Sequence, residues 1–227
     1  MVQRISLAHR PGSASPKAGD ATRQAIIDTA ERMFSDQGIA AVSLRSILTE
    51  AHANTAAVHY HFGSKDNLIA EVFTNRANRV AAERIQRLDD VLSSSDTKIR
   101  LEQILTAFIE PGFFGGADTL EAGEQFARLR ARLTTENPDL AGRLLSDCFN
   151  ESSLRFIGAI GGTLPHLTKA DIQWRFHALL GVIVYTLAGP GRIQSLTDNS
   201  CDPSNLHIAI EQLVPTLAGM FRAPSTS

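Results

Sequence analysis

The chain has 227 residues, with 22 Lys and Arg against 24 Asp and Glu, which gives a formal net charge of −2. Its 43% hydrophobic content is ordinary for a globular protein and argues against global disorder. The longest apolar run, 178–187, is about half of the roughly 18–20 residues that a membrane span needs, and residues 1–18 lack the apolar region of a secretory signal. We therefore expect a cytoplasmic protein with reduced thiols at Cys148 and Cys201, while the near-zero charge argues at first against nucleic acid.

The charge is unevenly distributed along the chain. Residues 1–87 carry 11 Lys and Arg against 8 Asp and Glu, a net charge of +3, whereas residues 88–227 carry 11 against 16, a net charge of −5. A mildly basic first part and an acidic second part suggest two different roles, although a swing of a few charges also arises by chance.

An irregular arm and an amphipathic helix open the chain. Residues 1–19 are rich in Pro, Gly and Ser and predict a disordered arm. From Asp20, apolar residues recur at steps of three and four, which predicts a helix that ends at Gly38.

Three helices are predicted next, at short intervals. One begins after Ser43 and another after Asn54, and a turn of three to four residues joins them. Ser64 can cap the following helix, which runs from Lys65 to about Leu88. Two short helices on such a turn form a helix-turn-helix, whose second helix enters the major groove of DNA.

The rest of the chain also has helical periodicity, and no segment alternates as a strand does. Further helices are predicted at 94–109, 120–134, 138–160, 169–188 and 203–222. We predict an all-α fold of nine or so helices, with a helix-turn-helix domain at 20–66, a helical body at 67–222 and a flexible tail at 223–227.

Two segments, 43–47 and 57–68, resemble the DNA-binding domain of the TetR/AcrR transcriptional regulators. The sequence Tyr-His-Phe-Gly-Ser-Lys at 60–65, followed by Leu68, carries most of this resemblance. It implies a homodimer that binds an operator in double-stranded DNA and has an all-α ligand-binding and dimerisation domain at 67–222. The family usually has Gly where this chain has His52 and Ala where it has Leu48, so we expect a positive and slightly strained φ at His52.

The resemblance also implies which residues contact DNA. The expected contacts come from the helix after Ser43, from the recognition helix and from the start of the next helix: Ser43, Arg45, Thr55, Ala56, His59, Tyr60, His61 and Lys65. Lys65 is the expected phosphate anchor, whereas packing inside the domain is the alternative role for Tyr60 and His61. We expect no metal at His59 and His61, because residues two apart on a helix point in different directions.

In the body, segments 174–181 and 185–189 are similar to the PsrA-like, fatty-acid-responsive subgroup of the family. This similarity implies an apolar effector of the fatty acyl type. Candidate ligand residues are the aromatic and polar side chains of the middle and late helices, with Asn150 as a further handle: Phe108, Phe113, Phe126, Arg130, Phe149, Phe156, Trp174, His177 and Tyr185. The alternative is that the phenylalanines simply fill a helical core and that His177 is a satisfied core histidine.

A dimer interface is predicted from the last two long helices. The helix at 169–188 is apolar nearly all round and must be buried on several sides, and the helix at 203–222 adds an apolar stripe. Together they would form a four-helix interface with a two-fold mate, and Pro215 should bend or break the last helix.

We therefore expect a dimeric repressor, without cofactor or membrane attachment, that an apolar effector releases from a palindromic operator, with the helix from Lys65 as the coupling element. An enzyme is disfavoured because no nucleophile elbow is visible and Gly158 to Gly162 follows no strand. A module that uses its helix-turn-helix only for protein contacts is opposed by Arg45, Thr55, His59 and Lys65.

Overall fold

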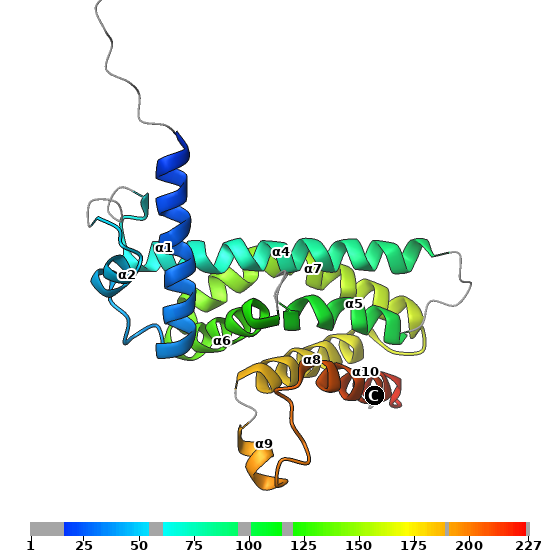
Figure 1. The fold of residues 1–227 in the computed structure, drawn as a ribbon. Coiled ribbons are helices and arrows are strands. Elements are labelled where there is room, and N and C mark those ends of the chain that lie inside the picture. The colour runs from blue at the N-terminus through cyan, green and yellow to red at the C-terminus, as the bar shows by residue number, and fades with distance from the viewer. Residues whose placement is uncertain (1–15, 55–60, 95–100, 115–119, 189–190, 226–227) are drawn as a thin grey trace, which may run out of the picture.

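The structure is a computed structural model that describes residues 16–54, 61–94, 101–114, 120–188 and 191–225. Within these ranges the secondary structure is helical and contains no strand, which confirms the all-α prediction. The nine helices of the described residues (Figure 1) are α1 (Pro16–Gln37), α2 (Leu44–Glu50), α4 (Lys65–Ser93), α5 (Leu101–Phe114), α6 (Leu120–Glu136), α7 (Pro138–Thr163), α8 (Lys169–Ala188), α9 (Gly191–Leu196) and α10 (Leu206–Arg222). None of them is long and apolar enough to cross a membrane.

The long helix α4 connects the two ends of the molecule (Figure 1). At its start it packs with α1, and α1, α2 and the start of α4 form the N-terminal head, which contacts α6 of the body through α1. Along the rest of its length it packs against α7 and α5. The helices α8 and α10 lie on the side of α5, α6 and α7 that faces away from α4.

Serine caps fix where two of the head helices begin. The Ser43 hydroxyl accepts a hydrogen bond from the backbone N–H of Ser46 at 3.0 Å, and the Ser46 hydroxyl accepts one from the N–H of Ser43 at 3.1 Å. This reciprocal pair is a capping box in which serine replaces the usual Glu or Gln. Ser64 caps α4 by accepting from the N–H of Asn67 at 3.1 Å. The predicted starts after Ser43 and Ser64 are therefore confirmed.

The buried residues form two hydrophobic clusters, and these do not coincide with the two predicted domains. The first joins the head helices to α6 and the first half of α7, through residues such as Phe73, Phe126 and Phe149. The second joins the far end of α4 to α5, α8, α10 and the second half of α7, through residues such as Phe108 and Phe156. The head and the near end of the body thus share a continuous core across the predicted boundary at residue 66.

One helix begins earlier than expected, and one short helix was not predicted. α1 begins at Pro16 rather than Asp20, so four residues assigned to the disordered arm are helical. Proline is well suited to a first helical position, because an N–H there would have no partner within the helix. α9 was not predicted as a helix, since it has no buried residue and therefore no apolar periodicity.

Two prolines lie inside helices. α10 continues past Pro215, so the predicted break at this residue is wrong, and the predicted bend stays a prediction. Pro215 and Glu211 are both exposed, so the carbonyl that loses its N–H partner can bond to water. α5 similarly continues past Pro111 to Phe114, beyond the end predicted at residue 109, and Phe113 lies in the core.

Candidate functional site

The start of α2 presents the first candidate DNA-contacting residues. Ser43 is exposed, and its hydroxyl and backbone groups are engaged in the capping box. Arg45 lies in the first turn of α2 with an exposed side chain. The apolar side of α2, Ile47 and Leu48, is buried against the head, so Arg45 is held on a fixed helix with its charge in solvent.

The turn that follows α2 has the expected unusual backbone. His52 adopts a φ of 50°, in the left-handed region that glycine favours, which confirms the expectation drawn from the missing family Gly. The N–H of Ala53 bonds back to the carbonyl of Leu48 at 2.9 Å and closes the turn. The chain thereby leaves α2 sharply, as a helix-turn-helix requires.

Thr55, Ala56, His59 and Tyr60 lie outside the described residues. Of the expected recognition helix, the structure places only its end, where His61 is half-buried with its ring 6.0 Å from that of Phe62. Phe62 is 5% exposed and belongs to the core of the head.

Lys65 stands at the first position of α4 and is half-buried. Its ammonium donates a hydrogen bond to the carbonyl of Ile39 at 2.6 Å, which ties α4 to the loop between α1 and α2. An ammonium has three donors, so this bond leaves donors that can contact a phosphate. Lys65 therefore has a structural contact that sequence reasoning missed.

The C-terminal end of α6 contacts the head directly. The Glu136 carboxylate accepts a hydrogen bond from the N–H of Ala40 at 2.8 Å, and Arg132 donates to the carbonyl of Asp36 at 3.3 Å. Gly38, with a φ of 91°, allows this approach, because a Cβ there would lie 2.9 Å from Glu136 Oε1. The body thus reaches the head through α6 as well as through α4.

The candidate ligand residues separate into two groups. The phenylalanines are core residues: Phe108, Phe113, Phe126 and Phe156 are at most 1% exposed, and Phe149 is 6% exposed. They pack on one another and on other core residues, as in the pair Phe108–Phe156, whose ring centroids are 4.9 Å apart. In this structure the phenylalanines therefore fill the helical core, which was the alternative to a role in ligand binding.

The polar candidates of α8 and α7 point outward instead. Trp174 is 73% exposed and Tyr185 is 58% exposed, and His177 is also exposed, with its ring 5.9 Å from that of Trp174. Asn150 is exposed and donates to Ser146 at 2.6 Å. These residues do not converge with the phenylalanines on one pocket.

Arg130 is the candidate that remains inside the body. It is half-buried on α6, with its guanidinium carbon 5.9 Å from the centroid of the Phe149 ring. Next to it lies Arg84 of α4, which sequence reasoning did not single out and which is 2% exposed. Arg84 lies in the apolar stripe of α4, four residues after Val80 and four before Leu88. A charged residue at an apolar position of the helical repeat is the sequence signal that could have indicated a buried arginine.

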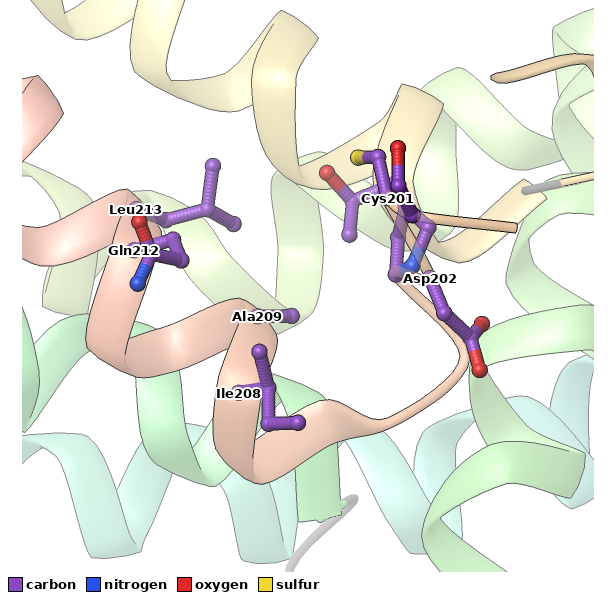
Figure 2. Close-up of a pocket in the computed structure, with 9 residues that line it drawn as sticks. Cys201, Asp202, Ile208, Ala209, Gln212 and Leu213 are labelled. Atoms are coloured by element: carbon purple, nitrogen blue, oxygen red, sulfur yellow. The ribbon is translucent and has the colours of Figure 1, made fainter. Parts of the chain in front are cut away.

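A hollow of about 390 Å³ lies elsewhere, between α10 and the loop that precedes it. Figure 2 shows Cys201 and Asp202 of the loop facing Ile208, Ala209 and Leu213 of α10. Most of these side chains are exposed, and none of the sequence-predicted ligand residues lines the hollow.

Sequence comparison gives the head and the body matching assignments. Residues 26–72 match the family of bacterial regulatory proteins called tetR, and residues 106–220 match the tetracyclin repressor-like C-terminal domain. This protein belongs to the TetR family. Its members are transcriptional regulators that bind DNA through the helix-turn-helix described above.

Individual relatives of this TetR-family chain are similar over different parts. The regulator AcrR of Shigella flexneri is 40% identical over 52 residues, which span 23% of this chain and only 24% of AcrR. A tetR-family regulatory protein from Rhodococcus RHA1 has the same fold, with a TM-score of 0.63 at 17% identity over 90% of this chain and 98% of that one. The fatty acid degradation regulator FadR from Bacillus halodurans gives a TM-score of 0.60 at 15% identity over 94% of this chain and all of that one.

Proposed function

We propose that this protein is a dimeric repressor that binds a palindromic operator and is released from it by an apolar small molecule. The observation that carries the proposal is the geometry of the head. A capped α2 holds Arg45 in solvent, and the left-handed turn at His52 directs the chain into the expected recognition helix. The match of residues 26–72 to the TetR family supports the same assignment.

The charge distribution supports DNA binding by the first part of the chain, residues 1–87, rather than by the second part. The 11 Lys and Arg of residues 1–87 exceed their 8 Asp and Glu, whereas the rest of the chain is acidic. Contacts between cationic side chains and phosphates supply most of the sequence-independent affinity for DNA. Arg45 and Lys65 would bind phosphates, and Thr55, Ala56, His59, Tyr60 and His61 would read or approach the bases, with Ser43 beside them.

The exposed faces of α8 and α10 support a dimer. Four of the six exposed large hydrophobic side chains of the described residues lie on α8, α9 and α10: Trp174, Tyr185, Leu196 and Ile208. On α8 the exposed residues Trp174, His177, Ala178, Gly181 and Tyr185 follow the spacing of one helix face. Such a face is typical of a protein interface, and a two-fold mate would cover it.

The effector is proposed to act by changing the separation of the two heads. A dimer places its recognition helices at half-sites about one helical turn of DNA apart, so a small change in head position weakens binding. An effector achieves this only if it binds the released form more tightly than the DNA-bound form. The resemblance of the body to the PsrA-like subgroup, together with the fatty acid degradation regulator FadR among the structural neighbours, favours a fatty acyl effector.

The direct test is selection of genomic fragments by the purified full-length protein, followed by sequencing. We expect one enriched palindromic motif, and we expect Arg45→Ala to lose it. Arg143→Ala is the matched control, since Arg143 is an exposed arginine of α7 in the body. Raised transcription of the neighbouring gene on deletion of the protein would support repression, and failure to enrich any motif would contradict the proposal.

A further inference from the structure

The most deeply buried charged side chain of the described residues is Arg84. Its Nε donates a hydrogen bond to the carbonyl of Phe108 at 2.8 Å, and its guanidinium carbon lies 3.8 Å from the centroid of the Phe108 ring. Its Nη2 is buried and has no hydrogen-bond partner among the residues that the structure describes. A buried, unsatisfied donor on a charged group is rare and calls for an explanation.

A second guanidinium shares the same surroundings. Arg84 lies 5.4 Å and Arg130 lies 5.9 Å from the centroid of the Phe149 ring, as measured from the guanidinium carbons. Burial, together with a smaller effect of the charge of Arg130, lowers the pKa of Arg84 to about 9. Burial also lowers the pKa of Arg130 to about 10. Both remain cationic at neutral pH.

No carboxylate compensates these two charges within the described part of the chain. The ion pairs among the described residues involve other arginines, such as Arg76 with Glu31 at 3.0 Å and Arg222 with Glu102 at 2.6 Å. Two like charges that are desolvated and unpaired destabilise a fold, and apolar residues of similar size would pack there more favourably. Packing therefore does not explain why both arginines are present.

The position of the pair in the fold suggests what would compensate it. Arg84 lies between the two hydrophobic clusters, with Phe149 of one and Phe108 of the other on either side. The Arg84 guanidinium therefore adjoins the aromatic rings of both clusters. Gly112 faces the same point, because a Cβ there would lie 2.7 Å from Arg84 Nη2.

We propose that Arg84 and Arg130 bind the carboxylate of an effector that is otherwise apolar. A guanidinium offers paired N–H donors whose spacing matches the two oxygens of a carboxylate, and one such anion would satisfy the free Nη2 and bridge the two cations. The adjoining aromatic rings suit a hydrocarbon chain. This inference rests on the proposed function, because it names the chemical class of the effector.

The site also lies on the elements that reach the head. Arg130 and Glu136 are on the same helix, and Glu136 bonds to Ala40 of the head, while α4 carries both Arg84 and Lys65. A void beside Arg130, between α6 and α8, measures only about 10 Å³, which is room for about one water molecule. Entry of an acid would therefore separate α6 from α8 and move the part of α6 that contacts the head.

Calorimetric titration of the full-length protein without DNA tests the proposal. The probes are hexadecanoate, hexadecan-1-ol and hexadecanoyl-CoA, each below its micellar concentration, with inorganic phosphate as a fourth. We expect the free acid to bind at least about tenfold more tightly than the alcohol, as charged hydrogen bonds predict. The thioester has no carboxylate, so it should also bind more weakly than the free acid. Phosphate alone should bind weakly.

Arg84→Met and Arg130→Met should each remove the preference for the acid over the alcohol, and Arg143→Met should keep it. Circular dichroism establishes that each variant is folded, and Arg84→Lys provides a second variant that keeps the charge and should retain part of the preference. Equal affinity for acid and alcohol, tighter binding of the thioester, or an unchanged acid preference in both folded methionine variants would overturn the proposal. Operator binding by the protein without effector is measured separately. A failure of DNA binding would contradict the proposed function but would not contradict the carboxylate site.

Discussion

Glu136, the last residue of α6, accepts a hydrogen bond at 2.8 Å from the backbone N–H of Ala40, in the loop that leads into α2. The two residues are 96 positions apart in the sequence, so this bond links the body to the head through the tertiary fold. Arg132 strengthens the link by donating to the carbonyl of Asp36. Under the proposed mechanism, we expect a shift of α6 to reach the loop that leads into α2, the helix that carries Arg45.

Replacing Glu136 should weaken this link. In Glu136→Ala the N–H of Ala40 loses its partner, and we expect the free energy of unfolding to fall by about 1 kcal/mol. We also expect the effector to be less effective in releasing the protein from DNA, because α6 is no longer bonded to the loop between α1 and α2. Urea unfolding and operator binding with and without effector measure the two effects. Glu121→Ala, an exposed glutamate in the first turn of the same helix, is the control and should change neither.

Removing the charge of Arg45 should weaken DNA binding without unfolding the head. Its side chain is exposed, so Arg45→Ala should change the melting temperature little. If Arg45 of each subunit contacts one phosphate, the slope of log K against log salt for the dimer should become shallower by about 1.8, which is about 0.9 for each phosphate. Fluorescence anisotropy with a labelled operator at several salt concentrations measures the slope. An unchanged slope and affinity would exclude Arg45 from the DNA interface.

A charge on the outer face of α8 should dissociate the dimer. Trp174 is 73% exposed, so Trp174→Glu costs little within one subunit but would bury a carboxylate in the proposed interface. We expect analytical ultracentrifugation to give a dimer for the wild type and a monomer for this variant at micromolar concentration. Leu154→Glu is the matched control, because Leu154 is 68% exposed on α7. A monomeric wild type would refute the interface.

The unpaired charge of Arg84 should lower the stability of the protein without effector. Arg84→Met removes a desolvated cation, and we expect the free energy of unfolding at pH 7 to rise by about 1–4 kcal/mol. Burial lowers the pKa of Arg84 in the folded state to about 9, so above this pH the unfolded chain binds the proton more tightly than the folded chain. The penalty is complete below pH 9 and declines as the pH rises above it. The difference between variant and wild type in urea unfolding should therefore shrink from pH 9 upward, and a difference that is independent of pH would contradict this account.

Local signals in the sequence predicted the head well. The start of α2 after Ser43 and the Ser64 cap of α4 were predicted because each depends on neighbouring residues, and the family resemblance predicted the positive φ of His52. The roles of the phenylalanines were less predictable, since a buried Phe and a ligand-lining Phe have the same periodicity. The fold decides between them, and it places Phe108 and Phe156 in the core.

Arg84 shows a second limit of sequence reasoning. Arginines on helices are usually solvent-exposed, and only the packing of α5 and α7 against α4 encloses this one. The short helix α9 was missed for the opposite reason, because its exposed side chains follow no apolar pattern. For Arg84 the missing information concerned contacts between distant segments, whereas α9 has no pattern of buried residues to detect.

The central claim, that this protein is a regulator that binds DNA, is tested most directly by the salt dependence of its binding to the selected palindrome. Anisotropy titrations of the full-length wild type should give an affinity that falls steeply and linearly on a log–log scale as salt rises, with two subunits per palindrome. An unrelated duplex of the same length should bind far more weakly. Absence of any salt-dependent binding to a palindromic site, by a protein that is folded and dimeric, would contradict the account.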